Sequence, residues 1–400
     1  MGPVTLHVVH SDDVAWFRDN LGSVRGAAAA LGRRIGLDEQ RCGEIALAAS
    51  ELVSNLVKHA VDGAIVLRVL RAGDEAGVEL VAVDRGPGMA DTEAAVQDGC
   101  SSVGTLGIGL GAIARLADLF DIHSVPGFGT VVAARFWSAR GAGRPDAGTS
   151  RQGPEAAAAG ITRAISGEEV CGDAWATRVD DGDGRQSVRA PAGRTASPGL
   201  DWSALTGFGT RGDTGRAWAT GTAVGTAPAA IGAGPALMVM LCDGLGHGPM
   251  AAKAAEAATR TFRGGGARHP QDAIQEVHVA LRGTRGAAVA VARIEPAAER
   301  VLFCGVGNIS GVLLGAETHA TLTSYPGIVG HQMRKLRSFV HPLPPGGALV
   351  MHSDGLTDRW SLDTVPGLLS QRPVVVAAHL LAHAGVRRDD ASVVVAKGAW

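Results

Sequence analysis

Two groups of residues have the types and the spacing that site chemistry requires. In the first, Glu51 and Asn55 stand four residues apart in a segment with helical apolar periodicity, residues 37–60. Side chains at this spacing lie on one face of a helix, here the polar face. A predicted strand then ends at Asp84. The second group consists of aspartates beside apolar segments: Asp173, Asp243, Asp354 and Asp389.

Glycine-rich turns surround the first group. Asp84 opens the turn Asp-Arg-Gly86-Pro-Gly88, and a series of alternate glycines precedes a helix predicted at 112–119. Backbone N–H groups at the start of a helix suit phosphate groups. The spacing matches neither GxGxxG behind a strand nor GxxxxGK[ST], which excludes the Rossmann and P-loop interpretations. The glycines of this series are Gly107, Gly109 and Gly111.

The second group favours a divalent-metal site. A single aspartate at a strand end usually forms a turn, but several beside the strands of one region can together supply oxygen ligands for Mg²⁺ or Mn²⁺. The chain has no CxxC pair, which argues against a cysteine zinc site.

Composition limits the class of protein. The 400 residues exceed what one core usually serves, and apolar residues form 46% of them, which predicts at least two folded domains. A net charge of -2 gives no field to attract nucleic acid or an anionic membrane. Five scattered cysteines and the lack of a leader or an apolar stretch of 18 residues predict a cytoplasmic protein.

The chain divides at a change of composition. Periodic residues 1–137 are followed by an Ala, Gly, Arg and Pro-rich linker, residues 138–160. A second periodic region, residues 161–400, is interrupted at about 183–234 by a segment without periodicity, which we interpret as a flexible insertion.

The first region resembles the GHKL (Bergerat-type) ATP-binding fold, in particular kinases of the RsbT and RsbW kind. The resemblance rests on SELVSN, VDRGPGM, DGCSSVGTLGIGLG and GFGT in that order. It implies that Asp84 binds the adenine amino group, that Asn55 holds Mg²⁺ and that Glu51 is the catalytic base. Other implied ATP contacts are Gly86, Gly88, Gly107, Gly109, Gly111 and Thr130. Thr105 departs from the glycine that relatives have in the lid.

The second region resembles the metal-dependent serine/threonine protein phosphatases of the SpoIIE and RsbX branch. The motifs are GDAW, CDGLGHG, GNISGVLL, HSDGLTD and RRDDAS. The resemblance implies two Mn²⁺ or Mg²⁺ ions held by Asp173, Asp243, the Gly244 carbonyl, Asp354 and Asp389. Asp390 remains an alternative to Asp389. Cys171 replaces a glycine that is common in relatives, and we expect His247 and His352 to have packing or supporting roles.

We therefore expect an α+β protein of two domains: a GHKL α/β sandwich followed by a phosphatase αββα sandwich. The resemblances imply a bacterial signalling switch that phosphorylates, with ATP, and dephosphorylates a STAS-type antagonist or stressosome scaffold. A sigma factor is another possible partner. The alternative is an anti-sigma-like first domain that binds ATP and sequesters a partner without kinase activity, fused to an active phosphatase.

Overall fold

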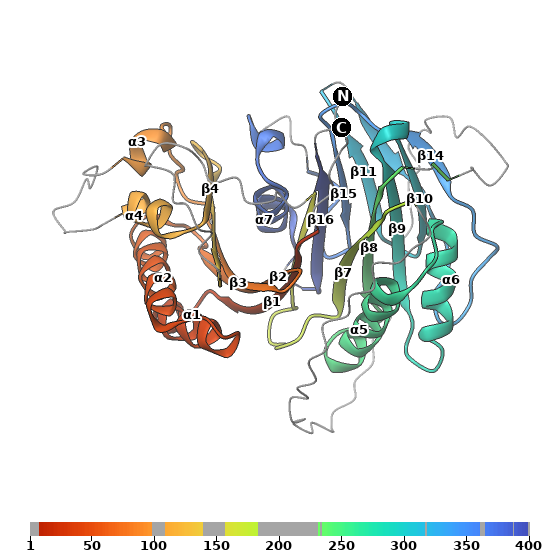
Figure 1. The fold of residues 1–400 in the computed structure, drawn as a ribbon, viewed down its shortest axis with the longest axis horizontal. Helices are drawn as coiled ribbons and strands as arrows, with labels where there is room; N and C mark the ends of the chain where they lie inside the picture. The colour runs from red at the N-terminus through yellow and green to blue at the C-terminus, as the bar shows by residue number, and fades with distance from the viewer. Residues whose placement is uncertain are drawn as a thin grey trace.

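The computed structural model describes residues 8–97, 109–138, 157–182, 231–232, 234–316, 318–360, 365–386 and 388–398. Layers of helices and sheets succeed one another along its longest axis (Figure 1). Among the described residues, none of the helices is long and apolar enough to cross a membrane.

The first domain is an antiparallel sheet in the order β1-β2-β3-β5-β4, with helices against one face. Asp38 begins the longest helix, because its side chain accepts the N–H of Arg41 at 2.7 Å. The apolar side of that helix, including Ile45 and Leu52, is buried against the sheet. The elements are β1 (His10–Phe17), α1 (Val24–Arg34), α2 (Glu39–His59), β2 (Ala64–Ala72), β3 (Glu75–Val83), α3 (Thr92–Val96), α4 (Gly109–Leu116), β4 (Leu119–Val125) and β5 (Gly129–Trp137).

The second domain packs two sheets face to face. One has the order β13-β10-β9-β8-β7 with β14 paired to β10, and the other has the order β12-β11-β15-β16-β6. Helices α5 and α6 cover the first sheet, and α7 covers the second, so the order of layers is αββα. The strands are β6 (Ala158–Arg163), β7 (Asp173–Asp180), β8 (Ala236–Gly244), β9 (Ala287–Glu295), β10 (Arg300–Val306), β11 (Ser310–Leu314), β12 (His319–Leu322), β13 (Ser324–Tyr325), β14 (Phe339–Pro342), β15 (Ala348–His352) and β16 (Ala391–Lys397). The helices are α5 (Pro249–Gly264), α6 (Pro270–Ala280) and α7 (Pro373–Ala384).

Helix α7 joins the two domains. Its sequence, PVVVAAHLLAHA, is apolar on every side, and ten of its twelve residues are buried. A helix of this kind must be covered on all sides. It contacts β6 and β16 of the second domain and β3 and β5 of the first. One hydrophobic core therefore contains residues of both domains, among them Val66, Val81, Val350 and Val393. The expected α+β class with two domains is confirmed.

Polar contacts also connect the domains beside α7. Arg68, only 1% exposed, donates to Asp13 at 2.5 Å, to Glu79, and to the carbonyl of Gly160 on β6. Asp13 in turn accepts the backbone N–H of Thr162 at 2.6 Å. A buried guanidinium requires such partners, because an unpaired charge in the interior is costly.

Several element boundaries differ from the expected ones. The helix expected at 112–119 begins at Gly109 and ends at Leu116, because Gly109 adopts a positive φ of 64° at the helix start and Leu119 already belongs to β4. Strand β6 includes the last residues of the expected linker, 138–160. Nearly all of the expected insertion, 183–234, lies outside the described residues.

The shared core predicts a stability effect. Leu380 on α7 is 2% exposed, so Leu380→Ala leaves a cavity and should lower the free energy of unfolding by about 2 to 5 kcal/mol. Urea unfolding of the full chain measures it, and we expect one transition reported by both domains. Val279→Ala, at a valine that is 55% exposed on α6, is the control and should change stability by less than about 0.5 kcal/mol. Two separate transitions in the parent chain would contradict the shared core.

Candidate nucleotide and metal sites

Asp84 stands where β3 ends beside β5. Its backbone N–H donates to the carbonyl of Thr130 at 3.0 Å, and its side chain accepts the N–H of Gly86 at 2.6 Å. The carboxyl is half-buried, and this burial raises its pKa above the ordinary aspartate value, although hydrogen bonding of the carboxyl to the backbone of Gly86 and Thr130 opposes the shift. Asp84 is thus a partly desolvated, fixed acceptor, suited to an amino group of a base.

Close backbone contacts explain two of the glycines around Asp84. Gly88 has a φ of +66°, and a Cβ there would lie 2.1 Å from the carbonyl oxygen of Val125. Gly129 has a φ of +85°, and its Cβ would lie 2.0 Å from the carbonyl oxygen of Asp84. Only glycine fits such positions. The turn after β3 and the turn between β4 and β5 are therefore packed directly on each other.

Ser124 is a member of this loop cluster that the sequence analysis missed. Its Oγ accepts the N–H of Met89 at 2.8 Å and lies 2.8 Å from Oγ1 of Thr130, its cross-strand partner. One feature of the sequence could have identified Ser124. It stands just before the PGFGT turn, where a tight hairpin places it opposite Thr130. Asp84, Gly86, Gly88 and Thr130 are brought together as expected; their roles toward ATP remain predictions.

Glu51 and Asn55 lie on the half-exposed polar side of α2, away from the buried residues of that helix. Gly109 and Gly111 begin α4, which packs against α2. Gly107 and Thr105 lie outside the described residues. His59 is the last residue of α2. Glu51 and Asn55 therefore lie on α2, which packs against α4, the helix whose first residues are expected to bind phosphate.

Asp173 and Asp243 are cross-strand neighbours on β7 and β8. Asp173 is 4% exposed and accepts the hydroxyl of Ser392 at 2.8 Å. Burial is the main reason that the pKa values of both aspartates rise above the ordinary range. Repulsion from neighbouring carboxylates adds to the rise, and the ones acting on Asp243 are Asp173, Asp354, Asp389 and Asp390. The second region therefore gathers its aspartates in one place.

Asp389 and Asp390 have different surroundings. Asp390 is buried, and its two oxygens accept the N–H groups of Ile165 and Gly172, each at 2.8 Å. Asp389 is exposed and accepts the N–H of Asp390 at 2.9 Å. Both oxygens of Asp390 are thus used to hold the loop before β7. This difference favours Asp389 as the ligand, which remains a prediction.

Glycines also allow the aspartate loops to meet. A Cβ on Gly244 would lie 2.5 Å from the carbonyl oxygen of Ala251, and one on Gly355 would lie 1.9 Å from that of Asp390. The loop after β15 therefore touches the loop before β16 without intervening side chains. This contact brings the segment of Asp354 against that of Asp390.

Three polar residues support the aspartates and were not singled out from the sequence. Asn308 donates to Asp354 at 2.5 Å, and the hydroxyl of Ser353 accepts the N–H of Ser392 at 3.0 Å. Ser353 also hydrogen-bonds Asp173. Each lies inside a motif quoted above, and Ser353 also directly precedes the expected ligand Asp354 in the sequence.

The two histidines near the aspartates have ordinary environments. His352 is buried, its Nε2 accepts the indole N–H of Trp360 at 3.3 Å, and its Nδ1 lies 2.9 Å from the carbonyl of Ser353. This pattern fits a neutral ring protonated on Nδ1, and burial lowers its pKa. His247 is exposed and lies 3.1 Å from Glu168.

Cys171, which stands where relatives often have a glycine, also has an ordinary environment. Burial raises the pKa of its thiol well above the usual value.

The donor set suits a hard divalent cation. Its side-chain donors are carboxylates, and repulsion among them would be relieved by a cation. The described residues contain no group of three or more His, Cys, Asp or Glu side chains arranged to bind a metal ion. Mg²⁺ needs only one or two direct carboxylates because it retains waters. The pair Asp173 and Asp243 meets that requirement.

Comparison with known proteins identifies two families. Residues 18–136 match the family described as histidine kinase-like ATPase domain, and residues 234–398 match the family described as stage II sporulation protein E (SpoIIE). The second match includes Asp243, Asp354 and Asp389, while Asp173 lies before it on the strand paired with β8.

One curated relative is the serine/threonine-protein kinase RsbT of Bacillus subtilis (strain 168), 36% identical over 118 residues, or 28% of this chain and 86% of RsbT. Two solved structures are similar at lower levels. RsbX in complex with magnesium has a TM-score of 0.40 and 16% identity, covering 60% of this chain and 94% of RsbX. The SpoIIE phosphatase domain with a regulatory fragment, from Bacillus subtilis, has a TM-score of 0.38 and 14% identity, covering 95% of this chain and 93% of that one.

The Asp84 geometry predicts base selectivity. Asp84→Ala should weaken ATP binding about tenfold to a hundredfold, because it removes a charge-assisted acceptor in a half-buried site. Equilibrium titration with a fluorescent ATP analogue measures the change. Asp74→Ala, at an exposed aspartate between β2 and β3, is the control and should bind normally. Equal affinity of the parent protein for GTP and ATP would contradict the assignment.

Proposed function

We propose that this chain, which belongs to the RsbT serine/threonine-protein kinase family through its first domain and carries a SpoIIE domain in its second, is a bifunctional signalling switch. The first domain transfers phosphate from ATP to a serine or threonine of a partner protein. The second domain removes phosphate from the same partner. The observation that carries the proposal is that one chain holds both the Asp84 loop cluster and the aspartate cluster of β7 and β8.

In the kinase reaction, Asp84 accepts a hydrogen bond from the adenine amino group. Asn55 would supply an oxygen for Mg²⁺, and Gly109 and Gly111 at the start of α4 would offer N–H groups to the triphosphate. Gly107, which lies outside the described residues, is a third such donor by the resemblance of the motif. Glu51, one helical turn before Asn55, orients the partner's hydroxyl and accepts its proton. When bound, Mg²⁺ neutralises charge on the phosphates.

In the phosphatase reaction, two Mn²⁺ or Mg²⁺ ions would be held by Asp173, Asp243, Asp354, Asp389 and the carbonyl of Gly244. When bound, these ions supply an activated water and neutralise charge on the phosphoryl group. Ser392 and Ser353 hold the Asp173 carboxylate, and Asn308 orients Asp354. This polar support fixes the orientation of the carboxylates.

The partner in this proposal is a STAS-type antagonist or stressosome scaffold protein, or a sigma factor. Membership of the RsbT family supports a serine/threonine kinase acting on a protein. The partner class itself rests on the resemblance of the motifs. A pulldown followed by phosphosite mapping would identify the protein and its modified residue.

Glu51 distinguishes a kinase from a domain that only binds ATP and sequesters its partner. Glu51→Gln should bind ATP with unchanged affinity and lose phosphotransfer by about 10² to 10⁴, because binding needs no base. Transfer of labelled phosphate from ATP to a purified STAS protein measures it. Glu75→Gln, at an exposed residue of β3, is the matched control. Undiminished transfer by Glu51→Gln would exclude its role as base, and absence of transfer by the parent protein would favour the sequestering alternative.

Asp243 tests the phosphatase assignment. Asp243→Asn removes a metal-binding charge, so release of inorganic phosphate from a phosphoserine STAS protein should fall by at least about a hundredfold while ATP affinity is retained. The parent activity should require Mn²⁺ or Mg²⁺ and stop with EDTA. Asp272→Asn, exposed on α6, should keep full activity. Phosphate release that persists in EDTA would refute metal dependence.

A further inference from the structure

Three histidines meet where the first domain's sheet covers α7, outside both sites described above. His379 and His383, about one turn apart on α7, are stacked with their ring centroids 4.2 Å apart and their planes at 20°. His123, on β4 of the first domain, meets His379 edge-on at 6.1 Å. His379 and His123 are 5% and 7% exposed, so this histidine cluster is part of the buried contact between the domains.

The hydrogen bonds of the histidine cluster also cross between the domains. Nε2 of His123 lies 3.1 Å from the carbonyl oxygen of Pro366, and since a carbonyl only accepts, this nitrogen carries the proton. His383 hydrogen-bonds the backbone of Phe128, in the turn between β4 and β5. Its Nε2 is buried and has no hydrogen-bond partner among the described residues. These contacts suit neutral rings, because a proton added to Nε2 of His383 would be a buried donor without an acceptor.

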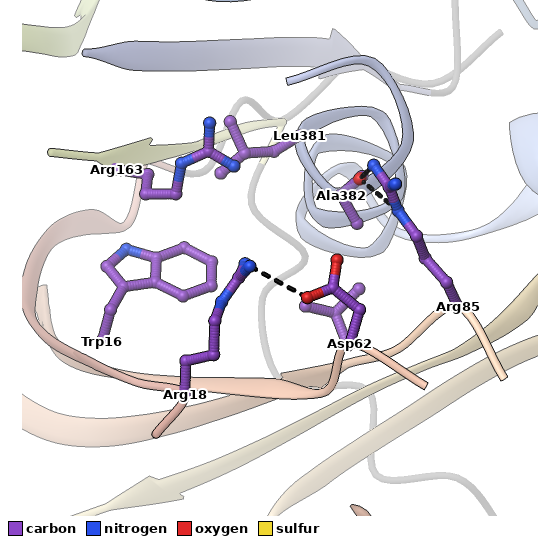
Figure 2. Close-up of a pocket in the computed structure, with 8 residues that line it drawn as sticks. Trp16, Arg18, Asp62, Arg85, Arg163, Leu381 and Ala382 are labelled. Carbon is purple, nitrogen blue, oxygen red and sulfur yellow. Dashed lines mark hydrogen bonds and ion pairs between the residues drawn. The ribbon is translucent and has the colours of Figure 1, made fainter. Parts of the chain in front are cut away.

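A permanent positive charge stands beside the histidine cluster. Figure 2 shows Arg85 of the first domain at the end of α7, where its Nε donates to the carbonyl of Ala382 at 2.8 Å. Ala382 directly precedes His383, and the charge of Arg85 disfavours a proton on that ring. Each histidine of the cluster that gained a proton would therefore place a new cation beside an existing one.

The carboxylates of the first domain that face α7 are paired with arginines. Asp121, two residues before His123, accepts the backbone N–H of Arg372 at 3.3 Å and lies 3.8 Å from its Nε. The other charged groups on elements around α7 also have partners: Glu79 with Arg68 and Arg135, Arg18 with Asp62, Arg163 with the carbonyl of Val386, and Lys397 with the carbonyls of Leu369 and Gln371. The groups that act on the charge of His379 are the two other histidines, and both disfavour a proton on it.

We propose that the histidine cluster makes the junction of the two domains acid-sensitive: the domains hold together while the rings are neutral, and protonation of the rings in mild acid opens the junction at α7. The bond from Arg85 to Ala382 crosses the same junction and is lost when it opens. The turn that begins at Asp84 is then released from the helix end that also contacts the loop after Asp354. Acid thus disconnects the two candidate sites while each domain stays folded.

The direction of the pH effect follows from burial. In the closed junction, burial lowers the pKa of His379 to about 3 and also lowers that of His383. The pKa of a ring exposed to water is about 6.5. The open form therefore binds protons that the closed form does not, and below about pH 6.5 each such ring favours opening by up to about tenfold per pH unit. Above that pH both forms are neutral, and the opening equilibrium is independent of pH.

Two backbone amides of the second domain report opening of the junction. The N–H of Thr162 donates to Asp13 at 2.6 Å and that of Arg372 to Asp121 at 3.3 Å, and both acceptors belong to the first domain. Amide hydrogen exchange of the full-length chain, corrected for the intrinsic rate, measures opening. From about pH 7.5 to about pH 5.5, where ordinary carboxylates stay charged, the protection of both amides should fall at least about tenfold. The amide of Val291, on the central strand β9, is the reference and should lose less.

Two variants assign the effect to the histidine cluster. His379→Phe keeps a buried ring that cannot take a proton, so the fall in protection should be about tenfold smaller than in the parent chain; misfolding cannot produce that result. His319→Gln, at an exposed histidine of β12, is the control and should respond to acid as the parent does. Protection of Thr162 that does not depend on pH, a fall of equal size in His379→Phe, or an equal fall at Val291 would overturn the proposal.

Discussion

The burial of α7 is the constraint on which the arrangement of the whole chain depends. A helix with apolar residues on all sides cannot lie on the outside of a sandwich, because one half would face water. The second domain covers one side of α7, and the first domain's sheet covers the other (Figure 1). Even its histidines stay uncharged, since burial lowers the pKa of His379 to about 3 and also lowers that of His383.

The end of α7 also relates the two sites to each other. On one side, Arg85 next to Asp84 donates to the carbonyl of Ala382. On the other, Thr357 donates to the carbonyl of Ala384 at 3.0 Å, and Val386 donates to that of Gly355 at 2.7 Å. The loop that follows Asp354 is therefore fixed to the same helix end as the turn that begins at Asp84. The two candidate sites belong to one packed unit, in which contacts of a single helix reach both.

Local patterns predicted much of this structure from the sequence. The DxGxG turn, the glycines around it and the strand-end aspartates are dictated by contacts within a few residues or between paired strands. The sequence therefore predicted that Asp84, Asp173 and Asp243 lie at the ends of strands, as they do. Their roles remain predictions. Ser124 and Asn308 were missed because their roles come from cross-strand and loop contacts. The packing of the two domains on opposite sides of α7 was not predicted, for the same reason. The sequence shows an apolar helix, but only tertiary packing shows that two sheets cover it. Arg68 likewise looks like an ordinary strand residue until Asp13, Glu79 and Gly160 surround it.

If one chain adds and removes phosphate on the same partner, a pulse and chase will show both steps. The intact protein labels a STAS partner from γ-labelled ATP, and excess unlabelled ATP is then added. We expect the label to leave the partner as inorganic phosphate while the total phosphorylated fraction stays constant, and to stay on the partner with Asp243→Asn. Label that persists on the partner during the chase with the parent protein would show that the chain does not remove the phosphate that it adds.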